Sequence, residues 1–335
     1  MARINLTFSS EFGENFWEKA SSSKNSIDLP WRMLKEQISM HAEIVTSKNK
    51  NENTDIAIGF NCIPTGHVRN KYLVLMECPS ITSEIYKDSN LNQANTIFSW
   101  SPELIKKYNA KKLYFPQFFP KKIKFKNESR KKFACIISAN KNTKKKSLES
   151  LYHDRVETIQ WFEKNSPTLF DLFGRGWKMP ALSHGPWIWQ LQKIVGKIGT
   201  TLGVIFFPSY QGEIADKYST LLEYKFNFCY ENASSYNGYI TEKIFDSFFA
   251  GCIPIYWGAP DIDQYIPADC YIDRRQFSSH EELLHHLQGI SEQDFIGYQE
   301  RIRNFLQSDA AKPFSAEYFA NTITKQILQD LGIPA

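Results

Sequence analysis

One polar loop in the second half of the chain holds side chains that could bind a phosphorylated sugar. Glu231 and Asn232 end a run rich in aromatic residues, and Tyr239, Glu242 and Lys243 follow after a segment of Ser, Asn and Gly. Free backbone N–H groups at a helix start attract phosphate, and a lysine adds a cation. A carboxylate repels phosphate, so Glu242 is better suited to bind sugar or ribose hydroxyls, or to stabilise developing positive charge. The alternative is that Glu242 only favours the helix dipole and that Lys243 is solvated.

The residues around this loop predict a strand, a loop and a helix. Phe226, Phe228 and Tyr230 alternate as in a buried strand. Apolar residues then recur at helical spacing from Ile244, and Gly251 stands where a helix would end. Residues 252–257 predict a second buried strand, which completes a βαβ-like unit of a parallel sheet. Ligands bind at the carboxyl ends of such strands, where the polar loop lies.

At these residues the chain resembles the alpha-1,3/4-fucosyltransferases of glycosyltransferase family ten. The donor motif of that family has the form YKF, FEN and YxTEK, followed by an apolar strand and a glycine turn. The matching residues are Tyr224, Lys225, Phe226, Glu231, Asn232, Tyr239, Thr241, Glu242, Lys243, Pro254 and Gly258. The resemblance implies that Lys225 and Lys243 belong to a GDP-fucose site, that Glu231 and Asn232 shape its sugar pocket, and that Glu242 and Tyr239 contact the ribose or fucose.

Two further segments resemble the donor half of the same family. Residues 135–164 are similar to its strand, Ser-x-Asn loop and arginine-bearing helix, which implies that Ser138, Asn140 and Arg155 lie at the donor. A guanidinium suits this role because it can bridge two phosphate oxygens. Residues 170–177 resemble a strand that ends in a Gly-Arg turn, so Arg175 would approach the nucleotide. Taken alone, Arg155 could be a surface residue of an amphipathic helix, and the turn could be an ordinary one.

A candidate general base lies in the first half of the chain. Residues 73–86 are similar to a Glu-Ser-Pro-Ser segment of the family, with Cys78 in place of the usual serine. Glu77 ends an apolar strand there and precedes a proline turn. Glycosyl transfer with inversion needs one carboxylate to take the proton of the acceptor hydroxyl. Glu77 is predicted to do so, and the alternative is a turn carboxylate that faces water.

The chain as a whole predicts two domains. Its 335 residues exceed the ~250–300 residues that one core usually holds. Strand-like runs at 4–8, 55–60, 72–76, 96–100 and 112–115 predict a first α/β domain, and the charged segment 120–132 predicts a linker. We expect an acceptor-binding Rossmann-like domain at 1–125, a GDP-sugar-binding one at 133–310, and a C-terminal helix at 311–335 packed on the body. This is the α/β fold called GT-B, two Rossmann-like domains facing a cleft, which the resemblance also implies.

The sequence predicts a cytoplasmic protein that could lie peripherally at the inner membrane. It has no apolar run of about 18 residues and no cleavable signal pattern, and a start at Met1 favours a bacterial enzyme over the Golgi-anchored animal members. Its six cysteines lack C-x-x-C spacing and predict reduced core thiols.

Basic runs at 121–132 and 141–146 account for much of the net charge of +4. Such runs can bind nucleic acid, but aromatic residues are sparse there and no nucleic-acid motif accompanies them. We therefore expect a solvated linker and loop and no nucleic-acid partner. The second run could still attract the anionic donor at long range.

Residues 181–207 combine Trp187 and Trp189 with Lys193 and Lys197 among many aliphatic residues. This composition suits a helix that lies in a membrane interface, where a lipid-linked glycan acceptor would be presented. The alternative is an insertion packed on the donor domain.

These features predict an inverting fucosyltransferase that moves L-fucose from GDP-fucose to a GlcNAc or Glc hydroxyl of an oligosaccharide, with an alpha-1,3 linkage. Arg155 and Lys243 would neutralise the diphosphate, so neither a metal nor another cofactor is expected. The Asp-x-Asp spacing of Asp261 and Asp263 is interpreted as a helix cap. The alternatives are transfer of another GDP-deoxyhexose and a non-catalytic glycan or nucleotide binder. We expect residues 10–40 and 61–70 to contact the acceptor. Trp17, Trp31 and His67 in these segments could stack on or bind the sugar, or they could be structural.

Overall fold

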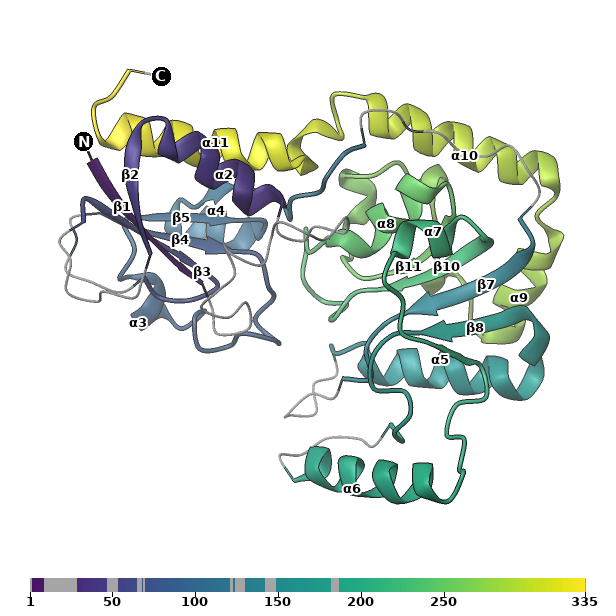
Figure 1. Ribbon diagram of the computed structural model, residues 1–335. Helices are drawn as coiled ribbons and strands as arrows, with labels where there is room; N and C mark the ends of the chain where they lie inside the picture. Colours follow the sequence, from purple (N-terminus) through teal and green to yellow (C-terminus); the bar gives the residue numbers. More distant parts are fainter. Residues whose placement is uncertain are drawn as a thin grey trace. The chain divides into compact units, whose positions relative to one another are not determined.

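The structure is a computed structural model, and the residues that it describes are 2–8, 29–46, 54–64, 68, 70–120, 123, 130–141, 149–181 and 187–334 (Figure 1). The chain forms two compact units. Unit 1 comprises Met1–Phe119, Asn237–Glu242 and Asp309–Ala335, and unit 2 comprises Pro120–Tyr236 and Lys243–Ser308. Trp17, His67 and most of the basic run at 141–146 lie outside the described residues.

Unit 1 contains a parallel sheet with the strand order β2-β1-β3-β4-β5-β6. Its strands are β1 (Ala2–Phe8), β2 (Ala42–Thr46), β3 (Ile56–Phe60), β4 (Asn70–Leu75), β5 (Thr96–Ser99) and β6 (Lys111–Lys112). Four of the five predicted strands are confirmed. The fifth, at 112–115, is wrong beyond Lys112, where β6 ends, although the N–H of Leu113 still donates to the carbonyl oxygen of Ser99 at 3.0 Å.

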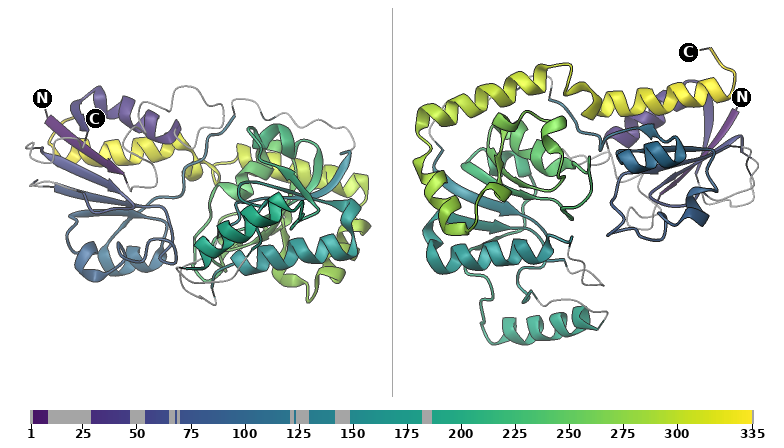
Figure 2. Two further views of the ribbon diagram at one scale, coloured as in Figure 1. Left: turned by 60° about the horizontal axis from the view of Figure 1, so that its bottom comes forward. Right: turned by 180° about the vertical axis from the view of Figure 1, so that it is seen from behind.

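The helices of unit 1 include one from the end of the chain. They are α2 (Leu29–Ser39), α3 (Asp88–Leu91), α4 (Pro102–Tyr108) and α11 (Ala316–Asp330). Figures 1 and 2 show α11 beside α2, and the ring of Phe319 meets that of Trp31 with centroids 4.9 Å apart. The predicted C-terminal helix is therefore confirmed. Trp31 is 4% exposed and also packs on Phe60, so its suggested role in sugar stacking is wrong.

Unit 2 contains a second parallel sheet, with the strand order β12-β11-β10-β7-β8-β9. The strands are β7 (Lys132–Ile137), β8 (Phe170–Phe173), β9 (Tyr210–Gly212), β10 (Tyr224–Tyr230), β11 (Ile253–Trp257) and β12 (Ile272–Asp273). The helices are α5 (Tyr152–Asn165), α6 (Ile188–Thr201), α7 (Lys217–Leu221), α8 (Glu242–Ala250), α9 (His280–Gly289) and α10 (Glu292–Gln307). Two parallel sheets with flanking helices are two Rossmann-like halves, which confirms the predicted fold class.

The predicted βαβ unit is present, because β10 and β11 pair in parallel across α8. Alternate residues of β10 face opposite sides of the sheet. Phe226, Phe228 and Tyr230 share a core cluster with residues of α5, whereas Asn227 on the other side donates from Nδ2 to Oγ of Ser247 in α8, at 2.9 Å. Because Tyr230 faces α5, the next residue, Glu231, faces α8.

Gly251 ends α8 with φ 64°, a left-handed value that glycine adopts without strain. The strand β11 follows directly, as the sequence predicts. Because all strands of this sheet are parallel, the loops after β7, β8, β10 and β11 emerge at one edge of unit 2.

Candidate functional site

The carboxyl edge of unit 2 is built around a buried ion pair. Glu231, the residue after β10, is 0% exposed, and its Oε2 accepts a bond from Nζ of Lys243 at 3.0 Å. Its backbone N–H also donates to the carbonyl oxygen of Trp257 at 2.8 Å. A buried carboxylate is costly unless it is paired, so this contact fixes Lys243 in the first turn of α8. The structure thus brings two predicted site residues together, but it does not present Glu231 to solvent.

Gly258 follows β11 at a position with no room for a side chain. A Cβ there would lie 2.3 Å from Oη of Tyr256 and 2.4 Å from Cγ of Glu231. Oη of Tyr256 accepts a bond from the N–H of Ala259 at 3.0 Å, and burial raises the pKa of this tyrosine well above its usual value. Position 258 therefore requires a glycine, because any side chain there would collide with Tyr256 and Glu231.

Arg155 of α5 holds the end of β10. Its side chain is buried, and Nη2 donates to the carbonyl oxygens of Tyr230 and Glu231, both at 2.7 Å, and to Oδ1 of Asn232 at 3.1 Å. The guanidinium also lies 4.7 Å from the ring centroid of Tyr152. Arg155 is therefore no surface residue, and these bonds fix the carbonyl groups next to the Glu231–Lys243 pair.

The loops after β7 and β8 lock onto each other. Asn140 donates from Nδ2 to the carbonyl oxygens of Gly176 and Met179, both at 3.1 Å, and its backbone N–H donates to the carbonyl oxygen of Arg175 at 2.8 Å. Gly174 has φ 125°, and a Cβ there would lie 1.9 Å from the carbonyl oxygen of Ser138. Three predicted donor residues, Ser138, Asn140 and Arg175, are thus neighbours at the same edge.

Two side chains of these loops remain available for contacts at the edge. Oγ of Ser138 is buried and has no hydrogen-bond partner among the described residues, whereas Arg175 is exposed. A buried hydroxyl without a partner costs ~1–3 kcal/mol, so a bound polar group would stabilise it. The hydroxyl lies at the edge where the sequence predicts the nucleotide-sugar site.

Lys225 is not brought together with the other predicted donor residues. It is the second residue of β10, and its Nζ lies 3.3 Å from a carboxylate oxygen of Glu292. A strand of this length is roughly 20 Å long, so Lys225 and Glu231 stand near opposite ends of the strand. The prediction that Lys225 contacts the donor is corrected by this placement.

In unit 1, the backbone of Glu77 is fixed from several sides. Oδ1 of Asn61 accepts the N–H groups of Met76 and Glu77, at 2.7 and 3.1 Å, and Asn61 itself has φ 52°. Nε1 of Trp100 donates to the carbonyl oxygen of Met76 at 2.9 Å, and Tyr86 donates to that of Glu77. Glu77, which follows β4, is half-buried. These hydrogen bonds fix the position of its backbone.

The side chain of Glu77 meets the YxTEK segment. Oη of Tyr239 donates to Oε2 of Glu77 at 3.1 Å, and the tyrosine ring lies 5.0 Å from that of Trp100. Tyr239 is 1% exposed and belongs to unit 1, as does Glu242, the half-buried first residue of α8. Burial raises the pKa of the neighbouring Cys78 to about 12, so this thiol is protonated at neutral pH.

Sequence reasoning missed three residues that shape these two edges. Asn61 and Trp100 hold the backbone beside Glu77, and Arg274 follows β12 in unit 2. Arg274 is buried, donates from Nη1 to the carbonyl oxygen of Phe277 at 2.7 Å, and lies 5.7 Å from the ring of Trp257. An asparagine directly after a buried strand is a usable signal, since it tolerates positive φ. The other two have no such local signature.

Among the residues that the structure describes, no group of three or more His, Cys, Asp or Glu side chains could hold a metal ion. Asp261 precedes the 3-10 turn Ile262–Gln264 but makes no side-chain cap bond, so the predicted cap is wrong in that respect. Its Oδ2 instead accepts from Oη of Tyr265 at 3.3 Å.

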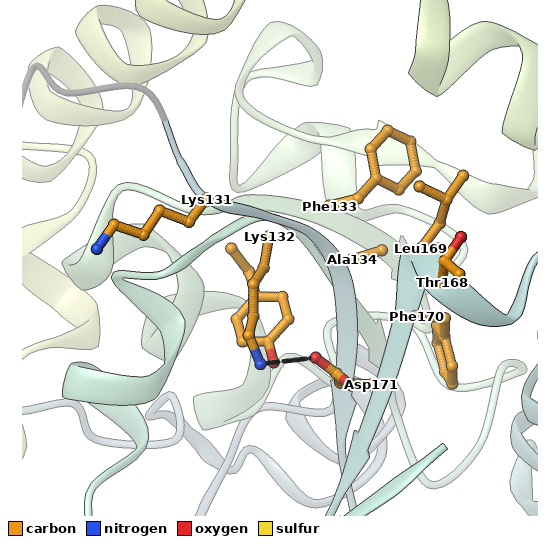
Figure 3. A pocket seen from close by; sticks show the side chains of 9 residues that line it. Lys131, Lys132, Phe133, Ala134, Thr168, Leu169, Phe170 and Asp171 are labelled. Atoms are coloured by element: carbon orange, nitrogen blue, oxygen red, sulfur yellow. Dashed lines mark hydrogen bonds and ion pairs between the residues drawn. The ribbon is translucent and has the colours of Figure 1, made fainter. Parts of the chain in front are cut away.

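A cavity of about 200 Å³ lies at the opposite edge of the unit 2 sheet (Figure 3). Lys132 lines it, and its Nζ lies 2.9 Å from Oδ2 of Asp171, which also accepts from Tyr224. These charges satisfy one another near the start of β7, away from Ser138 at the other end of the strand. The cavity therefore adds nothing to the candidate site.

Comparison with known proteins matches residues 127–300 to the family model for glycosyltransferase family 10 (fucosyltransferase), C-terminal part. An alpha-(1,3)-fucosyltransferase of Helicobacter pylori, FucT, is 34% identical over 92 residues, which are 28% of this chain and 17% of that protein. Alpha-(1,3)-fucosyltransferase 7 of Homo sapiens is 31% identical over 120 residues, which are 33% of this chain and 35% of that protein. The matches thus span about a third or less of these relatives.

Similarity to solved structures extends over nearly the whole chain. A crystal structure of an alpha1,3-fucosyltransferase with GDP-fucose has a TM-score of 0.58 at 16% identity, and the match covers 98% of this chain and 90% of that one. Likeness at this identity shows the fold alone. It supports the GT-B fold class, with two Rossmann-like halves, that the sequence predicts.

Proposed function

Because the chain belongs to glycosyltransferase family 10, we propose that it is a fucosyltransferase that moves L-fucose from GDP-fucose to a GlcNAc or Glc hydroxyl of an oligosaccharide, forming an alpha-1,3 linkage. The contact between Glu77 and Tyr239 carries this proposal, because it joins the candidate base to the donor motif at 3.1 Å. Both relatives are alpha-(1,3)-fucosyltransferases and the solved structure contains GDP-fucose, which supports the donor and the linkage.

Glu77 acts as the general base. Its carboxylate takes the proton of the acceptor hydroxyl while that oxygen forms a bond to the anomeric carbon of fucose. The bond from the anomeric carbon to the phosphate oxygen breaks, GDP leaves with the electron pair, and the configuration inverts. A carboxylate has about four lone-pair sites, so one bond from Tyr239 is compatible with taking a proton. The bonds from Asn61 fix the backbone from which Glu77 reaches the acceptor.

The carboxyl edge of unit 2 holds the leaving group. Lys243 and the first turn of α8 attract the diphosphate, and the hydroxyl of Ser138 gains a polar partner when the donor binds. Asn140 and Arg175 frame the same edge. Arg155 acts from behind, by holding the carbonyl groups of β10 and the side chain of Asn232.

The contacts to the sugar complete the proposal. Glu242 is the first residue of α8, Tyr239 lies three residues before it, and both contact the ribose or fucose. The positive groups at this edge take the part that a divalent metal plays in other transferases, so no metal or other cofactor is required. The enzyme therefore works with EDTA present.

The test is GDP release by the purified chain with GDP-fucose and each of N-acetyllactosamine, lactose and lacto-N-biose, with and without EDTA. Acceptor-dependent release that EDTA leaves unchanged is the expected result. If GDP is released from another GDP-deoxyhexose but not from GDP-fucose, that other sugar nucleotide is the donor. Binding of GDP-fucose without release, for all three acceptors and for free GlcNAc, would overturn the proposal in favour of a binding protein.

A further inference from the structure

Helix α6 of unit 2 carries a row of exposed apolar side chains. Trp187 is 77% exposed and Leu202 is 73% exposed, although such residues are usually buried. With the also exposed Leu191, Ile194 and Ile198 they recur every three or four residues, so they share one face of the helix. These five residues are called the α6 stripe. Contiguous apolar surface of this kind marks an interaction site.

The opposite face of α6 packs on the segments that connect the helix to unit 2. A Cβ at Gly196 would lie 2.5 Å from Cγ of Met179, and one at Gly199 would lie 2.5 Å from Cζ of Phe206. Gln192 is also buried. Figure 1 shows α6 outside the layers of helices that cover the sheet of unit 2. The two glycines therefore let one side of the helix pack closely on Met179 and Phe206, and the α6 stripe lies on the other side.

The charge around α6 has one sign. No acidic residue occurs between Asp171 and Glu213, whereas four cations do, namely Arg175, Lys178, Lys193 and Lys197. At 100° per residue, Lys193 and Lys197 stand roughly 100 to 140° around the helix from the centre of the stripe. Both are exposed. Long cationic side chains beside an apolar stripe are typical of a helix lying in a charged interface.

We propose that the α6 stripe docks this protein on an anionic lipid surface, with the stripe among the acyl chains and the lysines among the headgroups. A second copy of the chain fits less well, because two cationic segments without a nearby acid would face each other. Within the described ranges, no helix is long and apolar enough to span a bilayer. The 14 residues of α6 therefore lie in the interface.

The test is co-sedimentation of the full chain with vesicles, without donor or acceptor, so the outcome does not depend on fucosyl transfer. Wild type is expected to sediment with vesicles of phosphatidylcholine and phosphatidylglycerol. Leu191→Ser with Ile198→Ser should lower the partition coefficient roughly tenfold or more, because two aliphatic side chains no longer enter the apolar layer. Lys193→Gln with Lys197→Gln should lower it roughly fivefold per lysine, and only on the anionic vesicles.

The matched control is Met40→Ser with Tyr318→Ser, which removes two exposed apolar side chains of unit 1. It should sediment like wild type, and thermal unfolding should be unchanged in all variants because each altered side chain is exposed. Equal sedimentation of the stripe variant and wild type would overturn the proposal. So would a wild-type dimer, measured by sedimentation equilibrium without lipid, that the stripe variant turns into a monomer.

Discussion

Two glutamates follow buried strands of parallel sheets, and their surroundings differ. Glu231, after β10, is fully buried and bound to Lys243, and its neighbouring backbone is held by Arg155. Glu77, after β4, is half-buried, and its side chain accepts a bond from the hydroxyl of Tyr239. An ammonium group thus binds the first carboxylate, and a tyrosine hydroxyl donates to the second.

We propose that this difference separates a structural carboxylate, Glu231, from a reactive one, Glu77. A buried carboxylate bound to an ammonium stabilises its surroundings only while both charges remain. A general base must instead be able to gain a proton during each turnover, so it needs a fixed backbone and access to the acceptor. On this view, loss of Glu77 damages the reaction, and loss of the Glu231–Lys243 pair damages folding.

The largest expected effect is on turnover in Glu77→Gln. The amide cannot take the proton, so kcat should fall about 10²- to 10⁴-fold while GDP-fucose binding stays within a factor of about two. Acceptor-dependent GDP release and calorimetric titration with GDP-fucose measure the two quantities. Glu84→Gln, on the exposed ion pair with Lys87, is the control and should behave like wild type. Unchanged turnover in Glu77→Gln would remove the distinction between the two glutamates.

The next effect is on stability in Lys243→Met. It leaves the carboxylate of Glu231 buried without its cation, so the free energy of unfolding in urea should fall by about 3–5 kcal/mol. Adding Glu231→Gln removes the charge and should restore much of that loss, although activity stays low. Lys225→Met breaks the more exposed pair with Glu292 and should cost at most about 1 kcal/mol. Equal losses in the two lysine variants would contradict the structural role of Glu231.

A smaller loss is expected for Gly258→Ala. The new methyl group would press on Tyr256 and Glu231, which costs about 1–3 kcal/mol of unfolding free energy as the pair shifts. Gly289→Ala is the matched control, because a Cβ at Gly289 meets no atom within 4 Å. Urea unfolding curves for the two variants should therefore differ. If both resemble wild type, the packing around Glu231 is less tight than described.

The smallest effect is expected for Tyr239→Phe. The ring still packs against Trp100, but Glu77 loses a hydrogen bond worth about 0.5–1.5 kcal/mol. The value of kcat should fall at most about tenfold, and the free energy of unfolding should fall by no more than the worth of this hydrogen bond. Tyr318→Phe, on an exposed helix position, is the control. A loss as large as that in Glu77→Gln would assign the proton transfer to the tyrosine.

Local sequence patterns predicted most helices and strands, but they did not predict contacts between residues far apart in the chain. The aromatic alternation of β10 and the helical spacing of α8 each reflect one buried face, so sequence was sufficient there. The strand β2 was missed because it has only five residues and starts shortly after α2, so its apolar residues do not stand out from those of the preceding helix. Tyr239 and Glu77 lie 162 residues apart, and no periodic pattern encodes such a contact.

The roles of single site residues were predicted unevenly for a physical reason. Membership of a motif does not say at which end of a strand a side chain lies, so Lys225 was grouped with residues from the other end of β10. The sequence also did not predict that Arg155 is buried, with its guanidinium donating to carbonyl oxygens inside unit 2. Charged residues are usually expected at the surface, and the burial of Arg155 depends on the folded sheet.

The position of α11 has a consequence for how the chain folds as it is synthesised. Unit 1 begins with the first strands, yet its core includes Phe319 and other buried residues of α11, which follow every element of unit 2. Domains usually fold as they leave the ribosome, with the N-terminal one first. Here unit 2 can complete its sheet while unit 1 still lacks a helix, so the half that is made first becomes native last.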